Sequence, residues 1–454
     1  MLNAVLARLA VRRAAALLAA VLLAAGCSES LPEVSPPVQP QLAPAHGYDA
    51  GVFTLGVLVD LTAAAAEAES AALAGVQAYW AGVNARGGIA GLYPVELSVK
   101  HLDAVGTSAG DATALGDGGA AAIGEWDVAA LAYVSSVIDA ADVTAGLPLP
   151  VVPAVATLAG EDLDWVLTSA APVELTTVAL LNRFRASAPG ATWCVIVDGS
   201  PPGRRVATAA YAAGAARETV PAMLDLDVGE IEVLDLDASV FDVTDAVSDR
   251  QCGYVLVEAA EPGAIHVLER LPPNLTVVRR STLAAGLELP GQVELLIDPA
   301  PPWQTGRSAV MDAFAADWTR FHADTATEPL TQPASPTQPD GRPLADPRVR
   351  AGWLSQLRLH LLLEQAVAAG DVSRERLVAL APQVDPVDPD RNTLPGVPRI
   401  GMDISEPIGG GPLRTLRLHG RSDVAADELG LRQVLAVDVT HLVELLRDRL
   451  SDVG

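Results

Sequence analysis

Short apolar runs that alternate with stretches of helical periodicity constrain this chain more than any other feature. FTLGVLVDL (residues 53–61) has the length and composition of a buried strand, and residues 68–83 follow it with Ala72, Val76 and Val83 on one helical face. The same half of the chain predicts further strands at residues 93–103, 128–134 and 149–156, and helices at 108–115 and 137–145. Such a succession implies a mainly parallel sheet covered by helices on both faces.

The alternation begins again at TWCVIVDG (residues 192–199). It predicts strands at residues 230–237, 253–260 and 275–281, and helices at 204–216, 240–248, 264–271 and 352–369. The Pro- and Gly-rich stretch over residues 329–347 is expected to be an exposed loop. With 454 residues, of which 50% are hydrophobic, the chain has the material for two α/β domains, each a doubly wound parallel sheet.

The first residues have the pattern of a secretory signal. Three arginines precede an apolar run over residues 14–25, which is too short to cross about 30 Å of hydrocarbon as a helix. The run ends in LLAAGC, which resembles the bacterial lipobox, in which Cys27 would be acylated. We expect a lipoprotein signal peptide over residues 1–26 and a Pro-rich tether over 27–50, anchoring the protein to the extracytoplasmic face of the cell membrane. An ordinary signal peptide is the alternative.

The net charge of the chain argues against two classes of binding partner. The net charge of −26 and the pI near 4.5 argue against nucleic acid or an anionic membrane surface as a partner, because both would repel the chain. Lys100 is the only lysine among 30 basic residues, and alanine is abundant. This usage suggests a high-GC genome, such as that of an actinobacterium.

A family resemblance is carried by NARGGIAG (residues 84–91), with an apolar helix before it and an alternating strand after it. Together with a Ser-Ser turn, a Pro-x-x-x-Thr strand end and a later strand ending in Asp, it resembles the branched-chain amino-acid type of periplasmic binding protein. The resemblance covers about residues 52–381 and is weak over the last 70 residues. It implies two α/β lobes joined by a hinge that close on a small polar ligand.

The resemblance also implies a division of the chain. The first lobe is expected over residues 51–170, the second over 171–298, and a return to the first lobe over 299–380. Residues 381–454 are expected to pack on the second lobe. Partners would be a small-molecule ligand, such as an amino acid or related carboxylate, and the permease of an ABC transporter. We expect a monomer without a cofactor.

Ser135 and Ser136 are the leading ligand-binding candidates, because they follow an apolar strand where a helix-like segment begins. Their hydroxyls would give a ligand carboxylate directed hydrogen bonds without an opposing charge. The resemblance adds Thr157, although the alignment could instead place Ala154 or Ala156 at that contact. The alternative for the serines is that one of them caps a helix.

The remaining ligand-binding candidates come from other strand ends. The resemblance points to Thr62 in the first strand–helix turn and to an acidic residue, Glu258 or Glu261, that would receive an ammonium. Trp303 would cover the cleft, or would be a partly buried aromatic residue at a domain junction. Pro202 stands where related proteins have an aromatic residue, which argues against amino-acid binding.

Cys194 and Cys252 begin the expected first and third strands of the second lobe, which are neighbours when the strand order is 2-1-3. In an oxidising setting they would form a disulfide. Two reduced core thiols are the alternative.

Enzyme signatures are weak in this sequence. The seven histidines show no metal-binding spacing, and Ser200 lacks the flanking glycines of a nucleophile elbow. Residues 385–392 lack the Gly and Glu of a calcium loop, and the glycine run over 408–412 is a turn rather than a phosphate loop. We expect no catalytic residue and no metal site. The expected function is solute capture for an ABC permease, and the alternative is a sensor or scaffold lipoprotein with a diverged pocket.

Overall fold

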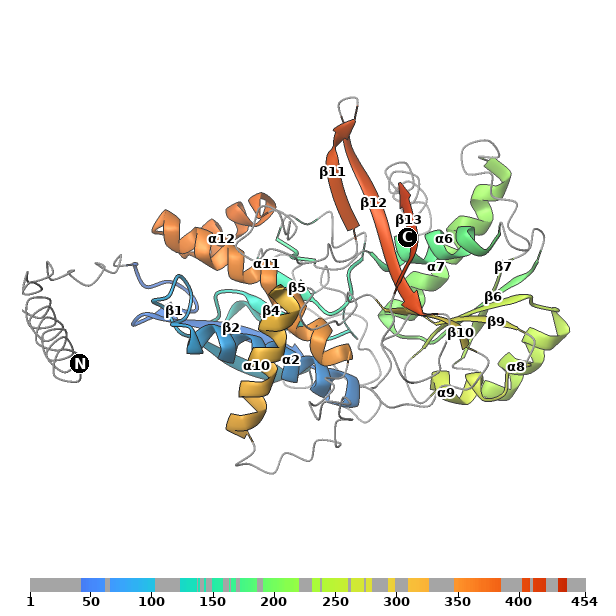
Figure 1. The fold of residues 1–454 in the computed structure, drawn as a ribbon, viewed down its shortest axis with the longest axis horizontal. Helices are drawn as coiled ribbons and strands as arrows, with labels where there is room; N and C mark the ends of the chain where they lie inside the picture. The colour runs from blue at the N-terminus through green and yellow to red at the C-terminus, as the bar shows by residue number, and fades with distance from the viewer. Residues whose placement is uncertain are drawn as a thin grey trace, which may run out of the picture. The chain divides into compact units, whose positions relative to one another are not determined.

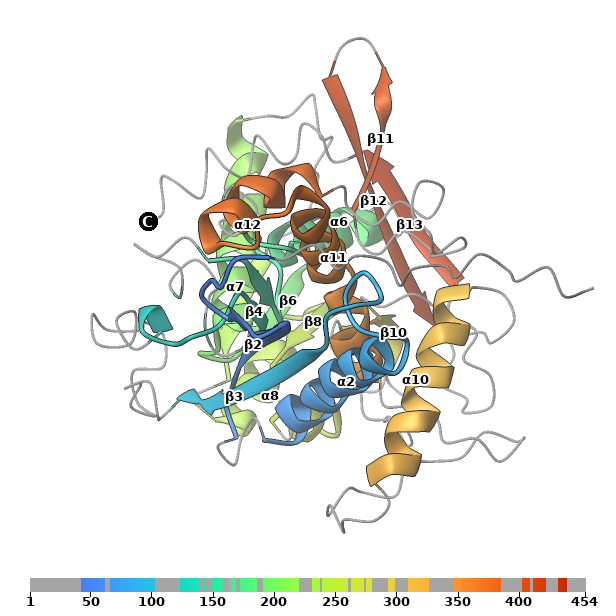
Figure 2. The same cartoon turned by 90° about the vertical axis from the view of Figure 1, so that its left-hand side faces the viewer.

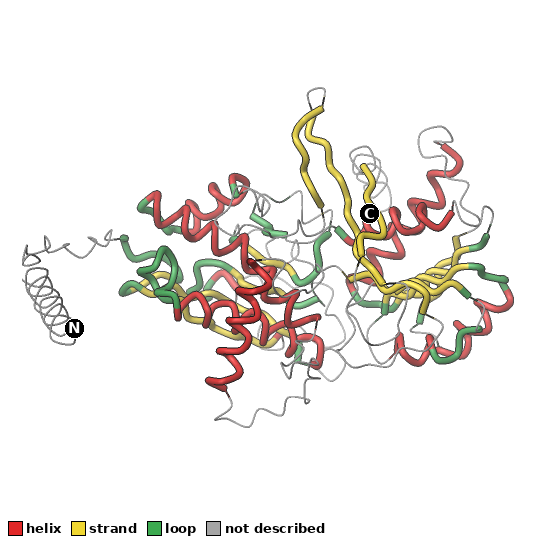
Figure 3. The backbone as a smooth tube through the Cα atoms, in the orientation of Figure 1, coloured by secondary structure: helices red, strands yellow, loops and turns green. Residues whose placement is uncertain are grey.

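The computed structural model describes most of the chain beyond residue 41 (Figure 1). The described residues are 42–61, 66–102, 123–136, 138, 143, 149–157, 163, 165–168, 172–185, 191–219, 231–236, 239–259, 263–272, 275–279, 293–298, 309–325, 347–384, 402–408, 411–421 and 432–438. All of them belong to one compact unit, Leu42–Gly454. Helices and strands alternate along it, as the red and yellow segments of Figure 3 show.

The first sheet has a parallel core of four strands in the order β3-β2-β4-β5. The strands are β2 (Val52–Val59), β3 (Val95–His101), β4 (Leu131–Val134) and β5 (Val151–Pro153). β1 (Tyr48–Asp49) pairs with β2 in the antiparallel sense. The central strands β2 and β4 are almost wholly buried, which fits their continuous apolar sequences, because helices cover such strands on both faces.

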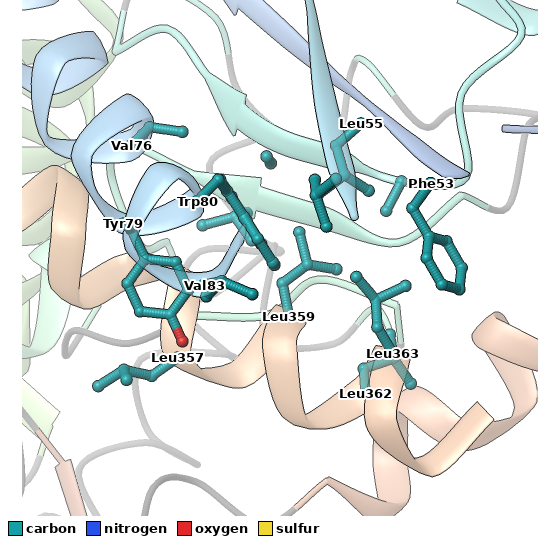
Figure 4. Close-up of a cluster of buried hydrophobic side chains, with 14 of the residues drawn as sticks. Phe53, Leu55, Val76, Tyr79, Trp80, Val83, Leu357, Leu359, Leu362 and Leu363 are labelled. Carbon is teal, nitrogen blue, oxygen red and sulfur yellow. The ribbon is translucent and has the colours of Figure 1, made fainter. Parts of the chain in front are cut away.

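Helices from distant parts of the chain build the core of this sheet. They are α2 (Ala66–Ala85), α10 (Ala309–Thr325), α11 (Pro347–Ala369) and α12 (Arg374–Leu380), followed by the 3₁₀ turn η2 (Ala381–Gln383). Figure 2 shows α2 and α10 side by side. Phe53 and Leu55 of β2 pack with Trp80 of α2 and Leu359 of α11 in one buried cluster (Figure 4).

A buried glutamine ties three of these elements together. Gln356 of α11 accepts a hydrogen bond from Trp80 Nε1 (3.0 Å) and donates one to the carbonyl of Ala132 in β4 (2.9 Å). The helices also approach closely, since a β-carbon on Gly75 would overlap the carbonyl of Val349 and one on Gly352 would overlap that of Ala72. Glycine at these two positions lets α2 and α11 pack backbone against backbone.

The second sheet has the strand order β11-β12-β10-β9-β8-β6-β7, and β13 also pairs with β12. Its parallel part consists of β6 (Trp193–Val197), β7 (Ile231–Asp235), β8 (Tyr254–Glu258), β9 (Thr276–Arg279) and β10 (Val293–Asp298). β11 (Met402–Ile408), β12 (Gly411–Arg421) and β13 (Arg432–Asp438) are antiparallel, and β12 pairs with β10. The last strands of the chain therefore extend this sheet.

Four helices accompany the parallel strands of the second sheet. They are α6 (Val173–Arg185), α7 (Pro201–Thr219), α8 (Val240–Asp249) and α9 (Gly263–Leu268). Ser239 caps α8 by accepting a hydrogen bond from the Phe241 amide. Val243 and Val247 of α8 and Val267 of α9 pack on the buried strand residues.

The expected disulfide joins Cys194 and Cys252, whose Cα atoms lie 5.8 Å apart. Strand β6 lies between β7 and β8, as the 2-1-3 order requires. Trp193 pairs with Tyr254 in the β6–β8 register, which places Cys252 just before the start of the neighbouring strand. The alternative of two reduced thiols is wrong for this structure.

The α/β fold with parallel sheets is confirmed, but several boundaries differ from expectation. The tether was expected to reach residue 50, whereas Leu42 and Tyr48 are buried and Tyr48 belongs to β1. Helix α11 begins at Pro347, five residues before its predicted start, and the helices α6, α10 and α12 and the C-terminal strands were not predicted. The predicted helix at 108–115 and the loop at 329–347, apart from its last residue, lie outside the described residues, as do residues 1–26 and Cys27.

Candidate functional site

The serine pair lies at the carboxyl end of β4, at the edge where ligands bind in open parallel sheets. The strand ends at Val134, and the amide of Ser135 donates to the carbonyl of Leu58 in β2 (2.9 Å). Ser135 is buried, and Ser136 is half-buried. The sheet therefore fixes the backbone of Ser135 and presents Ser136 just beyond it.

A carboxylate from the same chain occupies the donors of Ser136. The backbone amide of Ser136 (3.1 Å) and the Ser136 hydroxyl (2.9 Å) both donate to Oε1 of Glu69, in the first turn of α2. Glu69 is only 1% exposed. Sequence reasoning therefore predicted carboxylate binding at this position, and the structure shows an internal carboxylate there.

The surroundings of Glu69 have opposing effects on its charged form. Burial raises the pKa of Glu69, while hydrogen bonding from Ser136 and the nearby hydroxyls of Ser135 and Tyr133 lowers it. Burial and the adjacent Glu69 carboxylate raise the pKa of the Tyr133 hydroxyl. Three hydroxyl groups and one amide thus surround a buried acid.

Glu69 was not among the predicted site residues. The sequence signal that could have found it is its spacing: Glu69 stands three residues before Ala72 and seven before Val76, which places it on the apolar face of the predicted helix. Acids are rarely fully buried without partners, so such a position indicates a specific polar environment.

Thr157 follows β5 and is buried, together with Ala156. The carbonyl of Ala156 accepts a hydrogen bond from the Val173 amide at the start of α6 (2.9 Å). The alternative contact residue, Ala154, is exposed, and its amide donates to the carbonyl of Val134 (2.9 Å). Of the three residues considered for this contact, Thr157 and Ala156 are therefore buried, and Ala154 is exposed.

Acidic residues stand at the carboxyl ends of the second sheet. Asp235 and Glu258 both pair with Val197, and Asp198 follows Val197 directly. Glu258, the predicted ammonium ligand, is therefore one of three acids at neighbouring strand ends, and it is half-buried.

The turn after β6 is closed by Asp198. Its carboxylate accepts hydrogen bonds from the Ser200 amide (3.1 Å) and the Ser200 hydroxyl, which itself accepts from the Gly203 amide (3.2 Å). A β-carbon on Gly203 would overlap the Asp198 carbonyl, which explains the glycine at this position. Pro202 is half-buried at the start of α7.

Three of the predicted residues cannot be located. Thr62, Trp303 and the alternative acid Glu261 lie outside the described residues. Within the described part of the chain, no group of three or more His, Cys, Asp or Glu residues is arranged to hold a metal ion. No helix among the described residues is both long and apolar enough to cross a membrane.

The fold is that of the type I periplasmic binding proteins. A fatty acid ABC transporter substrate-binding protein from Thermomonospora curvata aligns with 90% of this chain and 96% of its own, with a TM-score of 0.61 and 14% identity. An R. palustris ABC transporter solute-binding protein in complex with 4-hydroxybenzoate aligns with 85% and 97%, with a TM-score of 0.55 and 12% identity.

A possible leucine/isoleucine/valine-binding protein from Rhodopirellula baltica SH 1 aligns with 82% of this chain and 90% of its own, with a TM-score of 0.54 and 13% identity. No protein-family model and no curated protein matches the sequence. The likeness is therefore one of fold alone.

Proposed function

We propose that this protein is an extracytoplasmic solute-binding protein that captures a small molecule and delivers it to an ABC permease. The observation that carries the proposal is the fold match over 90% of the chain to a substrate-binding protein of an ABC transporter. The polar residues at the carboxyl ends of β4 and β8 support it, because this is where doubly wound sheets bind ligands. The two lobes would close on the ligand about a hinge.

The proposal includes attachment to the membrane through Cys27. After removal of residues 1–26, an acylated Cys27 would hold the protein at the outer face of the cell membrane, as a monomer, within reach of its permease. The disulfide between Cys194 and Cys252 supports an extracytoplasmic location, since disulfides persist in oxidising compartments.

A sensor or scaffold lipoprotein of the same fold is the second candidate. The observation that favours it is Pro202, at the start of α7 just beyond β6, where the resemblance implies an aromatic ligand contact. A chain that has lost this contact would signal to a membrane partner without transporting a solute.

A thermal-shift screen separates these functions. The panel would contain fatty acids, benzoates, branched-chain amino acids, amines, amides, polyamines and nucleosides. A ligand at 100 times its Kd stabilises the folded protein by about 2.7 kcal/mol, which is readily measured. Stabilisation by one chemical class supports solute capture, whereas folded protein that responds to no class favours the sensor.

A further inference from the structure

The donors of Ser136 form an anion-binding position that is built into the sheet. The backbone of Ser135 is fixed by its hydrogen bond to Leu58, so the next amide and hydroxyl have set directions. Both are directed at a single oxygen, Oε1 of Glu69, at 3.1 and 2.9 Å. An amide and a hydroxyl converging on one oxygen are what a ligand carboxylate would require at the carboxyl end of β4.

Glu69 is present without a cationic partner. Among the described residues, no lysine, arginine or histidine forms a salt bridge with it, although its side chain is 1% exposed. A second carboxylate placed beside it would meet a like charge in a region of low dielectric constant. Glu69 therefore blocks this position to anions both sterically and electrostatically.

The other carboxylate oxygen of Glu69 is an unused acceptor. Oε2 is buried and meets no donor in hydrogen-bonding geometry among the described residues, although the hydroxyls of Ser135 and Tyr133 lie near the carboxylate. Buried acceptors without a donor are rare and costly, and functional sites are one place where they persist. An ammonium or hydroxyl group of a ligand would supply the missing donor.

We propose that Glu69 is a ligand-selecting residue that fills the anion position beside Ser136 and offers Oε2 to the donor end of the ligand. The ligand then carries an ammonium or hydroxyl group at this end, and compounds with a carboxylate there are excluded. This inference rests on the proposed function for the statement that a ligand binds, and it replaces the expectation of an amino acid or carboxylate held by the serines.

Pairs of compounds that differ only at one end test the selection. The pairs are benzoate and benzylamine, isovalerate and isoamylamine, and octanoate and octylamine, each titrated into the purified protein by calorimetry. We expect the amine of a binding pair to bind at least tenfold more tightly, and Glu69→Gln to reduce that preference to about threefold or less. Glu96→Gln removes an exposed acid from β3 and should leave the preference unchanged. A carboxylate that binds as tightly as its amine would overturn the proposal.

Chemical rescue gives a readout that does not depend on the natural ligand. Glu69→Ala removes the internal carboxylate, and acetate should then raise the melting temperature of the variant by several degrees more than chloride at equal ionic strength. The wild-type protein and the double variant Glu69→Ala/Ser136→Ala should show no such difference. Equal effects of acetate and chloride on Glu69→Ala would overturn the filled anion position. If this variant does not fold, Glu69→Gln in the paired titrations decides.

The two proposals fail in different ways. Rescue by acetate without binding of any compound by the wild-type protein would overturn solute capture and support the filled anion position. Binding of carboxylates by the wild-type protein would support solute capture and overturn the selection by Glu69.

Discussion

The carboxylate of Asp317 in α10 lies against the backbone of Gly82 in α2, in the space that a β-carbon at residue 82 would occupy. Asp317 is buried, and it accepts hydrogen bonds from Arg86, which directly follows α2, and from Trp353 Nε1 of α11 (3.3 Å). This one buried acid thereby connects α2, α10 and α11, three of the helices that pack on the first sheet.

Gly82→Ala should destabilise the protein by about 1–3 kcal/mol, because the added methyl group would displace Asp317 from its partners. Urea denaturation gives the free energy of unfolding. Ser70→Ala, an exposed substitution in the same helix, is the control and should change it by less than about 0.5 kcal/mol. An unchanged value for Gly82→Ala would show that the helices adjust freely.

Glu69 should make stability depend on pH. Burial raises its pKa above the ordinary value of 4.5, so the folded protein holds this proton more tightly than the unfolded chain. Its favourable contribution is complete below about pH 4.5 and is lost as the pH rises through the folded-state pKa. The stability of Glu69→Gln relative to the wild-type protein should therefore increase from pH 4.5 to 7.5, in urea denaturations at each pH. A difference that stays constant across this pH range would contradict a raised pKa of Glu69.

The disulfide should contribute about 4 kcal/mol to stability in the chain-entropy model, because it joins residues 58 positions apart. In a Cys27→Ser background, the unfolded protein without reductant should show no titratable thiol, and reductant should expose two. Two thiols before reduction would rule out the bridge. The free energy of unfolding of the double variant Cys194→Ser/Cys252→Ser, measured by urea denaturation, should be about 4 kcal/mol lower than that of the protein with the disulfide.

Arg374→Ala should loosen the segment before β4. The guanidinium of Arg374 donates to the carbonyls of Val128 (2.9 Å), Gly124 (3.3 Å) and Trp126. Hydrogen bonds to charged groups are worth more than neutral ones, so we expect a loss of about 2–3 kcal/mol in the free energy of unfolding. Arg376→Ala in the same helix is the control, and an equal loss there would indicate a general effect of charge removal.

Cys27→Ser should release the protein from the membrane. In a bacterial host that processes lipoproteins, the unaltered protein should sediment with membranes, and mass spectrometry should find acyl chains on Cys27. The variant should appear in the soluble extracytoplasmic fraction. Equal distribution of the two proteins would contradict the lipid anchor.

Local patterns predicted the central strands and α2 because the sheet buries these strands on both faces, so their apolar runs are continuous. The same reasoning paired Cys194 with Cys252 once the strand order was assumed. It did not reveal that α10 and α11 cover α2, since that packing depends on glycines and an acid that become meaningful only in three dimensions, such as Gly82 and Asp317.

The sequence predicted that Ser135 and Ser136 follow a buried strand, but it did not predict the carboxylate that lies beside them. Ser135 and Ser136 end β4, and the chemistry of binding a carboxylate was assigned to them. That Glu69 supplies the carboxylate depends on the packing of α2 against β4, and a single acid in a helical pattern is ordinarily a solvated residue.

The hydrogen bond from Trp80 to Gln356 spans 276 positions of the chain. During synthesis, the apolar face of α2 therefore emerges long before α11, the helix that covers it. Contacts of such high sequence separation form late, because a long loop must first be closed. Until α11 has left the ribosome, the apolar face of α2 therefore lacks the helix that buries it in the folded protein.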